Sequence, residues 1–150
     1  MQNTPSGKWG IDTNILVYAQ DRRSPFYEKS RLLFAQVISG SLEMVVSQQV
    51  ILEAHSVLIK VYKRPPKEVV ALIGTIVSNF SISVVCPLST TLHRFGGLLC
   101  SAPPFNDVFD IYLAATLLDN GITKLLTANE RDFTGIEGLY VVNPFSKKDP

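Results

Sequence analysis

The stretch Trp9-Gly-Ile-Asp-Thr-Asn-Ile-Leu-Val-Tyr-Ala-Gln20 changes from strand-like to helix-like sequence within a few residues. Its opening, Trp9 to Asp12, is a short apolar run typical of a buried strand, and Asn14 to Gln20 is predicted to form a helix. The same succession returns along the chain, where short apolar runs alternate with amphipathic segments of helical length. Strands that lead directly into helices are the repeating unit of α/β folds with a parallel sheet.

The remaining elements follow from the same patterns and from residues that start or stop helices. Ser24-Pro25 predicts a helix start and Gly40 its end, while Gly96-Gly97 is expected to break a weaker helix. Asn106 is expected to cap a later helix that Asn120-Gly121 ends. Further strands are predicted at 44–47, 82–85, 124–127 and 139–142, and further helices at 24–40, 47–60, 67–79, 90–98 and 106–120. We therefore predict an α/β fold, a three-layer α/β/α sandwich with a central, mainly parallel sheet.

Chain length and composition indicate one compact domain. The 150 residues are 46% hydrophobic and 18% charged, which is enough for one filled core and too few residues for two ordinary domains. We expect a disordered leader over residues 1–8, the folded domain over 9–145 and a tail over 146–150. The formal net charge of +1 identifies no polyanion-binding surface by itself.

The sequence also bears on the compartment. It contains no secretory signal pattern and no apolar run that approaches the roughly 20 residues needed to span a bilayer. Cys86 and Cys100 lack the spacing of metal ligands, so we expect both to be buried thiols in a reducing compartment. These features predict a cytoplasmic protein with no membrane attachment.

Carboxylates occupy positions where folding alone favours apolar residues. Glu53 stands in the apolar stripe of its helix, whose other members are Val50, Ala54, Val57 and Leu58. Asp110 faces the same way as the apolar side of its own helix, which Leu113, Ala114, Leu117 and Leu118 form. Both acids are therefore predicted to point inward. An unpaired buried carboxylate is costly, so these side chains need cationic partners or a shared bound cation.

Each of four acids follows the carboxyl end of a predicted strand or opens a helix. Asp12 ends the first strand, Glu53 lies early in the helix after the second, Asp110 lies in the first turns of a helix, and Asp132 follows the fourth strand. Ligands of parallel α/β sheets bind at this edge. Oxygen ligands without a His or Cys cluster suit Mg²⁺ or Mn²⁺ better than zinc. Taken singly, Asp12 could simply cap a helix and Asp132 could be an ordinary loop acid.

Several of these segments together resemble a known family. They are Asp12-Thr-Asn-Ile-Leu-Val-Tyr-Ala19, the Glu53 helix, Asp110-Ile-Tyr-Leu-Ala-Ala-Thr116 with Asp119-Asn-Gly121, and Leu126-Thr-Ala-Asn-Glu-Arg-Asp-Phe133 followed by Val141-Val-Asn-Pro144. In this order and spacing they resemble the PIN domain, and within it the VapC-type ribonuclease toxins of type II toxin–antitoxin systems. The resemblance implies a Mg²⁺- or Mn²⁺-dependent endoribonuclease that cleaves RNA. It also implies a homodimer held inactive by a cognate antitoxin protein.

The resemblance assigns roles to individual residues. Asp12 and Asp110 match the family's principal metal ligands, and Glu53 matches its second acid. Many members carry Asp where this chain has Asn129, while Asp132 matches an acid found three residues further on in a variant of the motif. The resemblance therefore leaves open which of the two fills the fourth position. The resemblance also implies four supporting polar residues, which are Thr13, Asn14, Thr127 and Asn129.

Two other classes of function remain open. One is a PIN-like module that binds RNA or protein and cleaves weakly because of Asn129. The other is a different acidic α/β enzyme, such as a phosphatase with an Asp nucleophile. That class needs a second Asp two residues after the first, where this chain has Asn14.

Residues that could contact RNA are spread along the chain. Basic candidates are Arg22, Arg23, Lys60, Lys63, Arg64 and Arg131, which are equally well read as solvated cations at helix ends. Aromatic candidates for stacking on an unpaired base are Tyr18, Tyr62 and Phe105, although aromatic side chains are more often part of a core. The helices over 24–40 and 47–60 are candidate dimer interfaces.

Overall fold

A computed structural model describes residues 7–146 of the chain. The elements run in the order β1 (Lys8–Ile11), α1 (Thr13–Tyr18), α2 (Tyr27–Ile38), β2 (Glu43–Ser47), α3 (Gln48–Lys60), α4 (Pro66–Asn79), β3 (Ser83–Val85), α5 (Thr91–Ser101), α6 (Val108–Asp119), β4 (Lys124–Leu126), the 3-10 helix η1 (Glu130–Phe133) and β5 (Tyr140–Val142). No helix in this range is long and apolar enough to cross a membrane.

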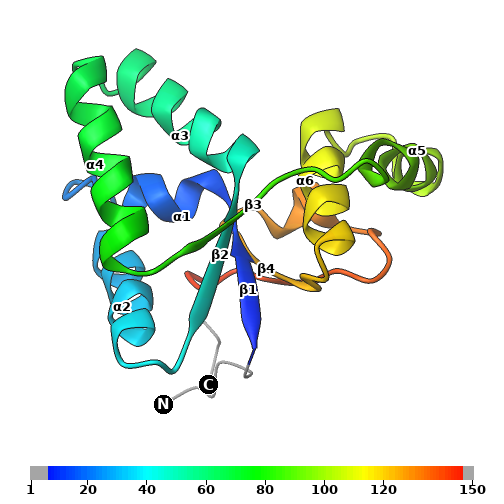
Figure 1. Cartoon of the computed structure of the whole chain (residues 1–150), viewed down its shortest axis with the longest axis horizontal. Coiled ribbons are helices and arrows are strands. Elements are labelled where there is room, and N and C mark those ends of the chain that lie inside the picture. Colours follow the sequence, from blue (N-terminus) through cyan, green and yellow to red (C-terminus); the bar gives the residue numbers. More distant parts are fainter. Residues whose placement is uncertain (1–6, 147–150) are drawn as a thin grey trace.

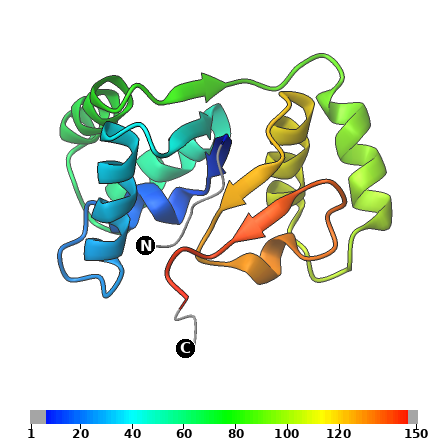
Figure 2. The same ribbon diagram turned by 90° about the horizontal axis from the view of Figure 1, so that it is seen from below.

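One five-stranded sheet of order β3-β2-β1-β4-β5 forms the middle of the molecule. Every pair of neighbouring strands is parallel. Helices α1 to α4 gather on one side of the sheet, and α5 and α6 lie on the other (Figures 1 and 2). The predicted α/β/α sandwich is therefore confirmed, with a sheet that is parallel throughout the described residues.

The core is densest where β1 and β2 meet the helices, because both strands are covered on both faces. Trp9, Ile11, Met44, Val45 and Val46 are almost completely buried. Strands covered on both faces read as continuous apolar runs, as these do.

A glycine in β1 allows α6 to approach the sheet. A Cβ atom on Gly10 would lie 2.8 Å from Cδ1 and 3.0 Å from Cδ2 of Leu117, which is itself fully buried in α6. Only a residue without a side chain fits between strand and helix at this point.

The structure corrects the expectation for the helix around Gly96-Gly97. Helix α5 runs without interruption from Thr91 to Ser101. Its packing on α6 offsets the helix-breaking tendency of the two glycines. Phe95 meets Tyr112 edge to face with ring centroids 5.7 Å apart, and Nε of Arg94 lies 3.0 Å from Oδ1 of Asp119. Tertiary contacts of this kind routinely override a propensity cost of about 1 kcal/mol per glycine.

Asn106 does not cap α6, as the sequence suggested. The capping residue is Asp107, whose Oδ1 accepts a hydrogen bond of 2.8 Å from the backbone N–H of Phe109. Asn106 is buried instead, and its Nδ2 donates to the carbonyl of Thr134 at 2.8 Å. The side-chain amide of Asn106 therefore binds a residue distant in sequence and does not cap the helix that follows it.

Helix α2 begins later than Ser24-Pro25. Its first residue is Tyr27, and Oγ of Ser24 accepts a 3.1 Å hydrogen bond from the backbone N–H of Phe26. Ser24 therefore closes a turn before the helix. The ring of Phe26 stacks on Phe145 with centroids 4.9 Å apart, which fixes this turn against the end of the chain.

Both cysteines are exposed, so the expectation of buried thiols was wrong. Cys86 follows β3, the edge strand of the sheet, and Cys100 lies on α5, whose only buried residue is Thr91. Elements at the edge and on the outside of the sandwich leave such side chains in solvent. At the two ends of the chain, β1 already includes Lys8 of the expected leader, while residues 1–6 and 147–150 lie outside the described residues.

Candidate active site

All four predicted acids line one open cavity of about 580 Å³. Asp12 directly follows β1, and most of the other lining residues belong to α1, α3, α6 and η1. Figure 1 shows α3 and α6 on opposite sides of the ends of β1 and β2. The supporting residues Thr13, Asn14 and Asn129 also line it, and Thr127 is buried behind Asp12. Parallel strands bring these segments to one edge, since their carboxyl ends point the same way. The structure thus places the predicted site residues together, and their chemical roles remain predictions.

Asp12 is the most deeply buried of the four acids, with 8% of its surface exposed. It caps α1, and Oδ1 accepts a 2.7 Å hydrogen bond from the backbone N–H of Thr13. Oδ2 accepts from the Thr127 hydroxyl at 2.8 Å and from Nδ2 of Asn14 at 3.1 Å. Burial raises the pKa of Asp12, and these hydrogen bonds oppose that rise because they favour the charged form. One residue therefore serves as the helix cap and as a site carboxylate.

Asn14 and Thr127 join the ends of β1 and β4 behind Asp12. Oδ1 of Asn14 accepts a 3.1 Å hydrogen bond from the backbone N–H of Ala128. The Thr127 hydroxyl, which donates to Asp12, accepts from the backbone N–H of Asn129 at 3.0 Å. These neutral groups fix the direction in which the Asp12 carboxylate points.

Neutral donors hold Glu53 in α3 on both of its oxygens. Oε2 accepts a 2.7 Å hydrogen bond from the hydroxyl of Thr13, and Oε1 accepts one of 2.9 Å from Nε2 of Gln49. Gln49 is not among the site residues predicted from the sequence. The signal was an amide four residues before an acid on the same helix, a spacing at which side chains meet. Because only Lys and Arg were considered as partners of Glu53 at this spacing, the neutral donor Gln49 was not predicted.

Asp110 lies in the first turn of α6, and its pKa is raised well above the ordinary value of an aspartate. Burial is the largest cause that raises its pKa, followed by the negative charges of Asp12, Asp132, Asp107 and Glu53, and the resulting value is about 7. Crowded carboxylates disfavour one another's charged forms. A cation bound in the cavity would therefore relieve the repulsion between these carboxylates.

Asn129 and Asp132 are the two candidates for the fourth position. Asp132 lies in η1, and Asn129 precedes that short helix. Both side chains line the cavity, and the negative charge of Asp132 acts on Asp110. Both candidates for the fourth position therefore line the cavity, and the choice between them stays a prediction.

The residues that line the cavity suit a hard cation. They include four carboxylates and several neutral oxygens, and no Lys, Arg or His is among them. Within residues 7–146, no three or more Asp, Glu, His or Cys side chains form a group that could hold a metal ion by themselves. Mg²⁺ is commonly held by one or two carboxylates while it keeps several waters, so a loose acidic cavity fits it better than it fits zinc.

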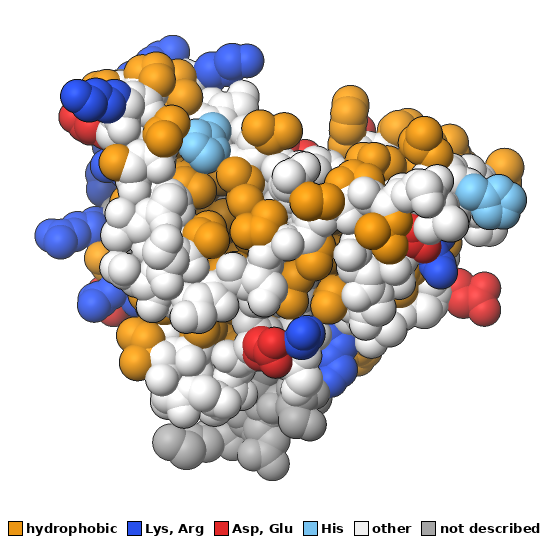
Figure 3. Space-filling model, in the orientation of Figure 1, with side chains coloured by type: hydrophobic (Ala, Val, Ile, Leu, Met, Phe, Trp, Pro, Cys, Tyr) orange, Lys and Arg blue, Asp and Glu red, His pale blue; other side chains and the backbone are white. Residues whose placement is uncertain are grey.

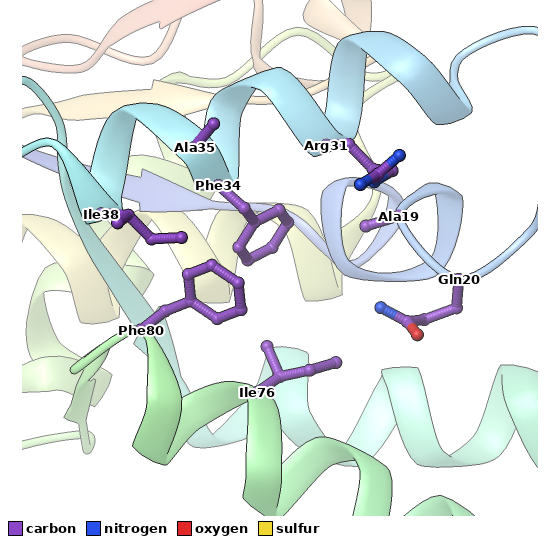
Figure 4. Close-up of a pocket in the computed structure, with 8 residues that line it drawn as sticks. All are labelled: Ala19, Gln20, Arg31, Phe34, Ala35, Ile38, Ile76 and Phe80. Atoms are coloured by element: carbon purple, nitrogen blue, oxygen red, sulfur yellow. The ribbon is translucent and has the colours of Figure 1, made fainter.

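A second hollow of about 250 Å³ lies between the end of α1, α2 and α4 (Figure 4). Phe34 and Phe80 point toward each other across it, with ring centroids 4.9 Å apart. Its only charged lining residue is Arg31, which also lies over the ring of Tyr27 at 5.6 Å. This hollow contains no acid, histidine or nucleophile, so the acidic cavity is the candidate active site.

Comparisons with known proteins agree with this geometry. The family model of the PIN domain matches residues 11–139. Ribonuclease VapC24 of Mycobacterium tuberculosis is 28% identical over an alignment of 150 residues that covers 91% of this chain and 96% of the relative. FitAcB from Neisseria gonorrhoeae has a TM-score of 0.72 at 16% identity and covers 91% of this chain and 97% of its own. A toxin–antitoxin complex from Klebsiella pneumoniae has a TM-score of 0.64 at 19% identity, with coverages of 93% and 99%. At these identities the two structures show a shared fold.

Proposed function

The chain belongs to the PIN domain family, and from this premise we propose that it is a metal-dependent endoribonuclease, the toxin of a toxin–antitoxin pair. The observation that carries the proposal is the meeting of Asp12, Glu53, Asp110 and Asp132 in one cavity whose lining includes no cationic side chain. The similarity to a ribonuclease over 91% of the chain supports the same chemistry.

In this proposal Asp12 and Asp110 hold Mg²⁺ or Mn²⁺. When bound, such an ion polarises a phosphoryl oxygen and lowers the pKa of a bound water. Glu53 or Asp132 would position the attacking water or hold a second cation near the leaving oxygen. Thr13, Asn14 and Thr127 keep the carboxylates in place through the hydrogen bonds described above. No covalent intermediate with the protein is required.

Basic residues near the rim supply a path for the RNA backbone. The cavity wall extends along α3 to Val61 and Tyr62, next to Lys60, Lys63 and Arg64. Figure 3 shows Lys and Arg side chains gathered where α3 ends and α4 begins. Contacts of this kind to phosphates give a salt-dependent affinity. Arg22 and Arg23 are also exposed. Arg23 is the weaker of these two candidates, because its Nε lies 3.6 Å from Oδ1 of Asp21.

Of the three aromatic candidates for base stacking, Phe105 remains the strongest. It is 53% exposed, and the Arg131 guanidinium lies 5.4 Å from its ring centroid. Tyr18 packs against Phe26 and Phe145, and Tyr62 donates its hydroxyl to Asp21 at 3.0 Å. An exposed aromatic ring beside a cation suits an unpaired base and its phosphate.

The partners in this proposal are RNA, an antitoxin protein and a second copy of the chain. The likeness to a toxin–antitoxin complex supports an antitoxin partner. Exposed apolar side chains support a homodimer, among them Leu32 and Ile38 on α2 and Leu52 on α3, at 62%, 74% and 70% exposure. Figure 3 also shows hydrophobic side chains gathered across the hollowed face around β3. Light scattering on the purified protein measures the oligomeric state directly.

The first experiment is cleavage of a mixed pool of structured RNAs with Mg²⁺, with Mn²⁺ and with EDTA. We expect cation-dependent cutting by the wild type and none by Asp12→Asn or Asp110→Asn. Glu43→Gln is the matched control and should cut normally, because Glu43 is exposed at the first residue of β2, at the opposite edge of the sheet from the cavity. Full activity of either aspartate variant would refute the assignment of Asp12 and Asp110 as the metal ligands.

A binding module that does not cleave is the second candidate function. Two observations favour it. Asn129 stands in place of a carboxylate, and residues 7–146 contain no group of three or more Asp, Glu, His or Cys side chains that could hold a metal ion by themselves. Such a module would bind RNA in EDTA as well as in Mg²⁺ and release no cleaved product. Gel-shift and cleavage assays on the same samples separate the two functions.

A further inference from the structure

Gln49 joins two acid-bearing helices in the wall of the cavity. It lies in the first turn of α3, and its Nε2 donates to Oε1 of Glu53 at 2.9 Å. The same nitrogen donates to the backbone carbonyl of Phe109 at 2.9 Å, across sixty residues of sequence. Phe109 immediately precedes Asp110. One side-chain amide therefore contacts an acid of α3 and the backbone next to an acid of α6.

The orientation of this amide follows from its partners. A carboxylate oxygen and a carbonyl oxygen only accept hydrogen bonds, so the NH₂ group has to face them. Oε1 of Gln49 is then left buried without a hydrogen-bond partner. A buried acceptor without a partner destabilises the folded state. A side chain retained only for stability gains little from this arrangement, which points to a function for the bridge.

The neutrality of Gln49 matters for the charge of the site. Glu53 is held by Gln49 and by Thr13, which donates to its other oxygen at 2.7 Å. A Lys or Arg at position 49 would orient Glu53 equally well and would also neutralise it. Neutral donors fix the carboxylate and leave its negative charge available to a cation.

We propose that Gln49 is a positioning residue, which sets the separation of Glu53 and Asp110 by bonding to the first and to the backbone beside the second. The inference rests on the proposed nuclease function. Gln49 itself does not touch the reacting atoms in this scheme. Its loss should weaken metal binding and turnover while RNA binding is retained.

The test compares Gln49→Met with Gln48→Met. Methionine keeps the length of glutamine and removes its hydrogen bonds, and Gln48 is an exposed neighbour on the same helix. Mn²⁺ affinity is measured by electron paramagnetic resonance without RNA, and kcat and KM are measured with an RNA that the wild type cuts. We expect Gln49→Met to lose about 10–100-fold in Mn²⁺ affinity and in kcat, with KM within about twofold of wild type. Gln48→Met should match the wild type in all three quantities.

A second variant guards against an effect on folding alone. Gln49→Lys keeps a donor next to Glu53, and we expect it to hold the melting temperature near the wild-type value while it still lowers Mn²⁺ affinity. A Gln49→Met protein that is less stable yet binds Mn²⁺ and cuts RNA like the wild type would overturn the inference and leave the nuclease proposal standing. A wild-type protein that neither binds Mn²⁺ nor cuts RNA would overturn both.

Discussion

Replacing Asp110 with Asn should make the metal-free protein more stable at neutral pH while it abolishes cleavage. Asp110 has a pKa of about 7, raised first by burial and then by the neighbouring carboxylates. Between about pH 4 and pH 7 the folded protein therefore holds this proton more tightly than the unfolded chain does. The stability of the wild type should fall as pH rises through this window. Asparagine carries no charge and escapes the effect.

The magnitude follows from the displacement of the pKa. A rise from 3.8 to about 7 corresponds to about 4 kcal/mol between the two protonation states. Asp110 is only partly buried, so solvent screening reduces this to about 2 kcal/mol. For a domain of this size, that gain raises the melting temperature by about 4–8 °C.

The assay is urea and thermal unfolding in EDTA at about pH 8 and about pH 5. The advantage of Asp110→Asn should be about 2 kcal/mol at the higher pH and less than half of that at the lower. Glu68→Gln is the control, because Glu68 is exposed on α4 and is not among the charges that raise the pKa of Asp110. Its effect should stay within about 0.5 kcal/mol.

Added Mn²⁺ reverses the order in the proposed mechanism. A ligand that binds only the folded protein stabilises it, so the wild type should gain stability with Mn²⁺ and Asp110→Asn should gain little. If Asp110→Asn is no more stable than the wild type at about pH 8, or if its advantage does not change with pH, the electrostatic reasoning is refuted.

Three further predictions concern single contacts. Gly10→Ala should lower the free energy of unfolding in urea by about 1–3 kcal/mol, because the new Cβ would lie 2.8 Å from Cδ1 of Leu117. Gly97→Ala, in open space on α5, should instead raise that free energy by up to about 1 kcal/mol. Equal effects of the two substitutions would contradict the packing argument. Thr127→Val removes the hydroxyl whose hydrogen bond holds down the pKa of Asp12, so the acidic limb of the pH–rate profile should move to higher pH, and an unmoved limb would contradict it. Asp119→Ala removes the acceptor of Thr90, Thr91 and Arg94, so hydrogen exchange should quicken in α5 and stay unchanged in α3, whereas a uniform change would point to global destabilisation.

Local sequence determined most of the architecture. The alternation of short apolar runs with amphipathic segments predicted the parallel sheet and its two helical layers, since hydrophobic periodicity is a local property of the chain. The positions of Asp12, Glu53 and Asp110 at strand ends and in first turns predicted that these acids would meet. The expected break at Gly96-Gly97 failed because α5 is sustained by its contacts with α6, which propensity cannot report.

Tertiary structure alone decided how the site is held and charged. The bond from Gln49 to the carbonyl of Phe109 joins residues sixty positions apart, and no local pattern specifies such a distance. The pKa of Asp110 depends on its burial and on charges from other segments, so it exists only once the chain has folded. The helical period of 3.6 residues lets the sequence determine which side chains of each helix face the cavity. Only the packing of helices on the sheet sets the distances on which hydrogen bonds and electrostatic repulsion depend.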